Sequence, residues 1–231
     1  MKRKAINYLL ILIGIPLIIA VGVVLFNDRK YNIISMAIAA VSCIPFFYAF
    51  EKRSSSSKEI VLIAVMVTLS ATGRFAFAAV PGFKPVTAIV VITAIYFGAE
   101  AGFVTGSLSA LISNIFFGQG PWTPFQMFVW GFLGFAAGII APTGLFKNKV
   151  FLAFYGAIAG VAFSLMMDLW TVLAMDGTFN VARYVAVVAA SLSFMAIYAV
   201  SNVIFLLLLE RPIGKKLSRI KRKYDLYTHE N

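Results

Sequence analysis

Long apolar runs separated by short polar or basic segments dominate the pattern along this chain. A membrane-spanning helix needs about 20 mostly apolar residues, because an α-helix rises roughly 1.5 Å per residue across a hydrocarbon core of about 30 Å. The pattern therefore predicts about eight spans. They are expected over residues 7–26, 33–50, 59–79, 85–97, 101–117, 124–141, 150–175 and 181–209.

A polar linker over residues 51–58, which contains a run of four serines, divides the chain. Before it, residues 1–50 are expected to form a two-helix transmembrane hairpin, since the first span is too long and lacks the small-residue cleavage site of a signal peptide. After it, residues 59–210 are expected to form a six-helix membrane domain, and residues 211–231 a basic tail. No internal repeat is evident, which gives an inverted-repeat transporter little support.

Glycine and proline mark details of the predicted helices. Three G-x-x-x-G pairs, at Gly102 and Gly106, Gly134 and Gly138, and Gly156 and Gly160, predict close helix packing. We expect Gly73-Arg74 to interrupt the third span. Pro124 is expected to open the sixth span, because proline suits the first helical position.

Lysine and arginine in the short loops set the orientation. If the N-terminus is inside, fifteen of these residues fall in inside segments and five outside, namely Arg29, Lys30, Arg74, Lys84 and Arg183. An even number of spans with both termini cytoplasmic fits this distribution. The basic tail follows the same rule, and a specific role in binding anionic lipid is a second interpretation.

The composition supports an all-α integral protein of the cell membrane. The 231 residues are 61% hydrophobic and only 13% charged, whereas soluble domains have roughly 45–50% apolar and about 25% charged residues. This excludes a soluble enzyme, a disordered protein and a nucleic-acid-binding module, although the formal net charge is +11. The basic residues lie between apolar runs rather than on one face.

The chain lacks the groups that catalysis or metal binding requires. It has one cysteine, Cys43, and one histidine, His229, so a metal site built from these residues is not expected. It has no P-loop, and no nucleophile paired with a base. We therefore expect no enzyme, catalytic residue, metal or cofactor, and any energised transport must use an ion gradient or the ATPase of a partner.

The first outer loop of the six-helix domain is unusually aromatic. It contains Arg74, Phe75, Phe77, Phe83 and Lys84, and two prolines limit its freedom. One interpretation is an interfacial loop that rests on lipid headgroups. The other is a lid that packs over a ligand.

The second outer loop, residues 118–124, leads into three residues on one helical face, Trp122, Gln126 and Trp130. An aromatic belt explains Trp122, but Trp130 lies about two turns deeper. Gln126 needs a hydrogen-bond partner within the membrane, and Asn114 is the expected neighbour. Polar contact between helices is one interpretation. A site for a large planar polar ligand is the other, because Trp and Gln together suit such a ligand.

Asp168 is an acidic residue deep within a predicted span, which by default indicates a functional site. Arg74 is its expected partner, and a purely structural ion pair is the alternative. Trp170 lies beside it, and Tyr184 begins the last span. The candidate ligand-binding residues are Arg74, Phe75, Phe83, Lys84, Asn114, Gln119, Trp122, Gln126, Trp130, Asp168, Trp170 and Tyr184.

Three stretches carry a resemblance to a known family. They are FKPVTA at residues 83–88, FGAEAGF at 97–103 and, most specifically, GQGPWTPFQM at 118–127. With these stretches the chain resembles the substrate-binding S components of energy-coupling factor (ECF) vitamin transporters, and it looks most like those assigned to cobalamin. The likeness covers the six-helix domain and leaves out the N-terminal hairpin.

The resemblance implies a mechanism and partners. S components bind a small-molecule vitamin from outside, then topple in the bilayer against a transmembrane scaffold, the T component, while two cytoplasmic ATPase subunits drive release. The family's Ala-x-x-x-Ala docking face has its nearest match here in Ala64 and Thr68, with Ala71 one turn on.

The ligand that the resemblance favours is cobalamin, with a flavin, another vitamin or a queuosine precursor left open. Other classes are an ion-coupled transporter that uses Asp168 as its proton carrier, and a membrane-embedded enzyme or assembly factor.

Overall fold

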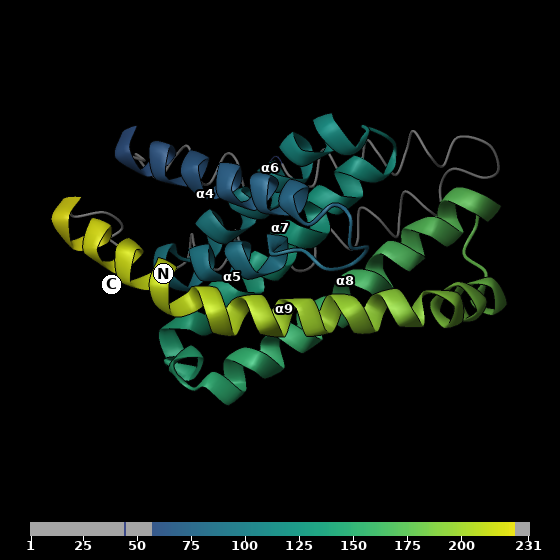
Figure 1. Cartoon of the computed structure of the whole chain (residues 1–231). Helices are drawn as coiled ribbons and strands as arrows, with labels where there is room; N and C mark the ends of the chain where they lie inside the picture. The colour runs from purple at the N-terminus through teal and green to yellow at the C-terminus, as the bar shows by residue number, and fades with distance from the viewer. Residues whose placement is uncertain (1–43, 45–56, 225–231) are drawn as a thin grey trace, which may run out of the picture.

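The computed structural model describes residue 44 and residues 57–224 (Figure 1). The predicted N-terminal hairpin therefore lies, apart from residue 44, outside the described residues. Residues 57–224 form six α-helices and two short 3-10 helices joined by short loops. In chain order these are α4 (Ser57–Ala76), α5 (Val86–Phe97), α6 (Ala99–Phe117), α7 (Trp122–Ile140), η2 (Ala141–Thr143), η3 (Leu145–Lys147), α8 (Lys149–Asp176) and α9 (Val181–Tyr224).

Each of the six spans predicted for this part of the chain corresponds to one α-helix. Within residues 57–224, five helices are long and apolar enough to cross a membrane, namely α4, α6, α7, α8 and α9. The sixth, α5, has only 12 residues. Its neighbours shelter it, because α5 packs against α4, α6, α7, α8 and α9, and Val86, Val90 and Val91 are completely buried.

The predicted glycine pairs bring α6 and α7 into close contact. A Cβ atom added to Gly102 would lie 2.7 Å from the carbonyl oxygen of Gly134, and one added to Gly134 would lie 2.5 Å from that of Gly102. One turn farther along each helix, a Cβ atom added to Gly106 would collide with the backbone of Trp130, and one added to Gly138 would collide with the backbone of Ala99. This confirms the predicted packing, since only residues without a side chain allow backbones this close.

The third pair joins α8 to α9. A Cβ atom on Gly160 would lie 2.5 Å from the Cα atom of Ala199, and one on Gly156 would lie 2.8 Å from Leu206. The two helices pack extensively against one another, and in the view of Figure 1 they cross obliquely.

Two predicted boundaries are wrong. Helix α4 continues without a break through Gly73 and Arg74, where the missing side chain of Gly73 makes room for the ring of Pro85. Helix α7 begins at Trp122, with Pro121 as its N-cap. Pro124 thus falls within the first turn, where its missing N–H breaks no intrahelical hydrogen bond.

The last helix also runs farther than its apolar stretch. Helix α9 has 44 residues, a length of about 66 Å at the usual rise, more than twice the thickness of a hydrocarbon core. Residues 210–224 continue the helix past the predicted end of the span, because they are rich in Lys and Arg, which favour helix. Pro212 lies in this part, where α9 changes direction (Figure 1).

Candidate functional site

Six polar and aromatic residues from five segments meet inside the bundle, towards its predicted outer side. We call them the outer cluster. They are Arg74 of α4, Lys84 of the loop before α5, Asn114 of α6, Gln126 and Trp130 of α7, and Tyr198 of α9.

A chain of hydrogen bonds links three of these residues. The Arg74 Nη1 atom donates to Asn114 Oδ1 at 2.8 Å and to Ser113 Oγ at 2.6 Å. Asn114 Nδ2 then donates to Gln126 Oε1 at 3.0 Å and to Thr123 Oγ1 at 2.9 Å. The predicted contact between Asn114 and Gln126 is therefore confirmed, and it connects α4, α6 and α7.

Trp130 is the centre of an aromatic group. Its ring is fully buried, and Nε1 donates to Tyr198 Oη at 2.8 Å. Tyr198 Oη also shares a hydrogen bond of 2.6 Å with Thr87 Oγ1. The ring of Phe163 on α8 stacks on Trp130 with centroids 5.0 Å apart and planes 19° apart. Trp130 thus has a defined position and orientation.

Two cationic side chains lie over this same ring. Arg74 Cζ is 5.1 Å from the Trp130 centroid, and Lys84 Nζ is 5.7 Å from it. Lys84 Nζ is also 5.1 Å from the Tyr198 ring and 5.5 Å from that of Phe194. Among the residues that the structure describes, no carboxylate forms an ion pair with either cation.

The position of Lys84 follows from its backbone. Lys84 N donates to Ser201 Oγ at 2.9 Å, and Ser201 Oγ donates to Lys84 O at 3.2 Å. These bonds pin the loop between α4 and α5 to α9 and direct the side chain over the rings. Burial lowers the pKa of Lys84 to about 7, and the nearby charge of Arg74 lowers it in the same direction. The charge on Lys84 therefore changes near neutral pH.

The sequence interpretation missed several members of this site. Tyr198 and Ser201 share one face of α9, and both are completely buried. Asn202 follows on the same helix, and both atoms of its side-chain amide are buried without a hydrogen-bond partner in the described part of the chain. Such groups are costly in a bilayer. The sequence did contain a signal for them, since Tyr198 and Asn202 lie one turn apart in an otherwise apolar run.

Three predicted site residues of the outer loops lie apart from the cluster's hydrogen bonds. The ring of Phe83 packs against Phe77 and Phe205, with centroids 5.6 and 5.0 Å away. Phe75 is mostly exposed and contacts Phe116. Gln119 is exposed and donates to Leu111 O at 2.9 Å.

The two other predicted tryptophans form a separate contact. The rings of Trp122 and Trp170 meet edge to face, with centroids 6.1 Å apart. Trp170 Nε1 is buried without a hydrogen-bond partner among the described residues. These residues connect the start of α7 to α8, beside the outer cluster.

The expected ion pair between Asp168 and Arg74 is not formed. Asp168 Oδ2 instead accepts a hydrogen bond of 2.5 Å from Ser191 Oγ on α9, and nearby Tyr184 Oη donates to Leu165 O. The reason is the packing of the helices, because α4 lies against α5 and α6, whereas α8 lies mainly against α9. In the described residues, no group of three or more His, Cys, Asp or Glu is arranged to hold a metal ion.

The candidate docking residues lie on an exposed face of α4. Ala64 and Thr68 are exposed, together with Ile60, Val61 and Val65, and Ala71 is half-buried. Thr68 Oγ1 donates to Ala64 O at 2.8 Å, so its hydroxyl is satisfied within the helix. The face is therefore largely apolar.

Comparison with known proteins identifies the family. A family model described as the S component of the ECF-type riboflavin transporter matches residues 54–219. A UPF0397 protein of Aliivibrio fischeri strain MJ11 is 26% identical over 157 residues, which cover 61% of this chain and 84% of that protein.

A UPF0397 protein of Aliivibrio salmonicida strain LFI1238 is 27% identical over 152 residues, which cover 58% of this chain and 81% of that protein. No solved structure matches the chain at a significant level. Because the family model spans well over half of the 231 residues, the chain belongs to the family of S components of ECF-type riboflavin transporters.

Proposed function

We propose that this chain captures a flavin-type vitamin at the outer cluster and delivers it across the membrane as the S component of an ECF importer. The cobalamin that the sequence resemblance favoured is not proposed further. The matching family carries a riboflavin description, and this supports the flavin alternative.

The observation that carries the proposal is the pair of cations over one buried ring. A flavin has a planar ring system whose face can stack on an aromatic side chain, and its edge carries carbonyl oxygens and ring nitrogens that accept hydrogen bonds. Trp130 and Phe163 supply aromatic rings, which here stack on one another, and Arg74 and Lys84 supply donors beside them. Small-molecule sites combine such apolar walls with a few placed polar groups.

The size of the cluster also favours a flavin over a corrinoid. The rings of Phe163, Trp130 and Tyr198 follow one another with centroids 4.8–5.0 Å apart. These rings pack directly on one another, so a planar flavin has to separate only two of them, whereas a corrin macrocycle with its side chains requires the helices to move much farther apart. Asn202 offers unused donors and acceptors to the polar end of a ligand.

Transport in this proposal depends on partners. The chain has no P-loop, so the scaffold subunit and two ATPase subunits of an ECF complex supply the energy. We propose the exposed face of α4 around Ala64 and Thr68 as the surface that docks on the scaffold, because small side chains let a partner helix approach closely.

Ligand titration of the purified full chain tests the proposal. Riboflavin and cobalamin are added separately, and tryptophan fluorescence and flavin fluorescence are followed. We expect saturable quenching by riboflavin, because a flavin near Trp130 accepts its excitation energy, and flavin in extracts of the protein by mass spectrometry. Saturable binding of cobalamin without riboflavin binding would overturn the flavin assignment.

A further inference from the structure

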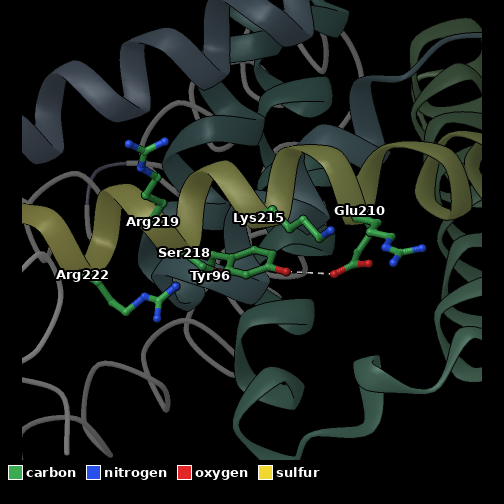
Figure 2. A pocket seen from close by; sticks show the side chains of 7 residues that line it. Tyr96, Glu210, Lys215, Ser218, Arg219 and Arg222 are labelled. Carbon is green, nitrogen blue, oxygen red and sulfur yellow. Dashed lines mark hydrogen bonds between the residues drawn. The ribbon is translucent and has the colours of Figure 1, made fainter.

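A cavity at the opposite, cytoplasmic end of the bundle is separate from the outer cluster. It has a volume of about 540 Å³ and lies between the end of α5 and the polar part of α9 (Figure 2). This volume is within the usual range for small-molecule sites. Its lining residues are Tyr96, Glu210, Arg211, Lys215, Ser218, Arg219 and Arg222.

The cavity is built on fixed contacts between two helices. The ring of Tyr96 lies against Gly214, where an added Cβ atom would meet the Tyr96 Oη atom. Tyr96 Oη donates to Glu210 Oε1 at 2.9 Å (Figure 2). Lys221 Nζ donates to Tyr96 O at 3.0 Å, in the last turn of α5. These contacts hold the polar end of α9 beside α5, so the cavity is not a chance gap along a free helix.

The charge of the cavity is strongly positive. Four cationic side chains and one carboxylate line it, and Glu210 already accepts the hydrogen bond from Tyr96. Arg211, Lys215, Ser218 and Arg222 follow the spacing of one helical face. Within residues 57–224, none of the four cations forms an ion pair. In Figure 2, Lys215 points along α9 towards Glu210, while Arg219 and Arg222 leave the helix in different directions.

The cavity lies next to the end of the apolar run of α9, which places it at the membrane surface. Its first residue, Glu210, directly follows the apolar run of α9 that ends at Leu209. The cavity therefore begins where the hydrocarbon core ends, at the level of the inner-leaflet headgroups. Cationic pockets at this level suit phosphate groups, because Arg and Lys donate charge-assisted hydrogen bonds to phosphate oxygens.

We propose that this cavity is a binding site for a phosphate group, supplied by an anionic phospholipid of the inner leaflet or by a free phosphate compound. The general excess of cytoplasmic Lys and Arg predicts attraction to an anionic surface without preference among the basic residues. A specific phosphate site in the cavity predicts instead that the basic residues lining it contribute much more to binding than basic residues on the other faces of α9.

Native mass spectrometry of the full chain in a neutral detergent tests the site. Phosphatidylglycerol, phosphatidylcholine and inorganic phosphate are added in separate arms. Retention of phosphatidylglycerol over phosphatidylcholine identifies a lipid headgroup as the source, and retention of inorganic phosphate alone identifies a free phosphate; both support the site. Equal retention of the two lipids with no phosphate adduct would overturn it.

Two neighbouring lysines provide a matched pair of variants. Lys215 lines the cavity, whereas Lys216 is also exposed but is not among the residues that line it. We expect Lys215→Gln to weaken binding of the retained probe about fivefold, which is typical for one basic residue at an anionic surface, and Lys216→Gln to have little effect. Equal losses in the two variants would show general attraction only and would refute the site. Riboflavin titration of both variants is expected to match the parent.

Discussion

Trp130 connects the hydrogen bonds and the ring contacts of the outer cluster. If a flavin stacks there, Trp130→Ala should weaken riboflavin binding about tenfold, because such contacts contribute about 0.5–1.5 kcal/mol beyond area burial. Gln126→Ala should weaken binding less, because it removes no ring contact and only breaks the hydrogen bond between Asn114 and Gln126. Fluorescence titration measures both effects.

Folding has to be controlled in this comparison. Trp130→Phe keeps an aromatic ring but loses the hydrogen bond to Tyr198, so it separates stacking from hydrogen bonding. Trp122→Ala removes a ring that contacts Trp170 instead. If all variants fold and Trp130→Ala binds riboflavin as the parent does, the ligand does not lie at the outer cluster.

Lys84 gives the site a pH dependence. Its pKa of about 7 means that the ammonium is present below neutral pH and lost above it. A ligand oxygen that accepts from the ammonium favours the charged form, so binding takes up a proton and the Kd should rise as the pH increases from about 6 to 8.5. Lys84→Met should bind more weakly and show no such dependence. If the Kd of the parent and that of the variant change with pH in the same way, Lys84 does not contact the ligand.

Asp168 tests the competing ion-coupled mechanism. Its carboxylate accepts from Ser191 and does not face Arg74, which fits a structural role between α8 and α9. We expect Asp168→Asn to retain uptake that requires the ATPase subunits. Uptake measured in cells with and without these subunits, and with a proton uncoupler, decides the question. Loss of an uncoupler-sensitive, ATPase-independent uptake in the variant would establish Asp168 as a proton carrier.

At the scale of elements, glycines decide how closely α6 and α7 approach. Any side chain at Gly134 would collide with the backbone of Gly102, so Gly134→Val should destabilise the protein by about 1–3 kcal/mol through overpacking. Thermal unfolding of the purified protein measures the change. Ala189→Val adds bulk on an exposed face of α9 and should leave the melting temperature nearly unchanged. Similar melting temperatures for both variants would contradict the packing.

At the scale of the whole molecule, the chain is a multi-pass membrane subunit of a transporter family and not an enzyme. In the proposals above, the outer cluster binds the ligand, the exposed face of α4 docks on the scaffold, and the polar end of α9 binds a phosphate group.

Docking can be separated from ligand binding. Ala64 lies on the exposed face of α4 and in its N-terminal half, which the charge distribution predicts to be cytoplasmic, about 15 Å along the helix from Arg74 by helix rise. Ala64→Trp should therefore abolish uptake and co-purification with the scaffold subunit, yet leave riboflavin binding intact. Both are measured on one preparation. Retained co-purification would refute the docking face, and a parallel loss of binding and stability would place Ala64 inside the bundle's own packing.

The helices, the membrane environment and the family could be predicted from the sequence, because each depends on local properties. Runs of about 20 apolar residues specify spans whatever their neighbours are. The contact of Asn114 with Gln126 was predictable as well, since an intramembrane amide needs a partner and the connecting loop is short. Glycine spacing indicated which helix faces approach closely, although not which helices they meet.

Contacts between distant segments were decided only by the tertiary structure. Arg74 bonds to Ser113 and Asn114 rather than to Asp168 because of how the helices are arranged, and no local pattern specifies that arrangement. The same holds for Tyr198 and Ser201, more than 100 residues from their partners Thr87 and Lys84. Sequence alone determined where the chain crosses the membrane, because transfer into lipid acts residue by residue. The site required the fold, because hydrogen bonds and ring contacts form only between side chains that packing brings together.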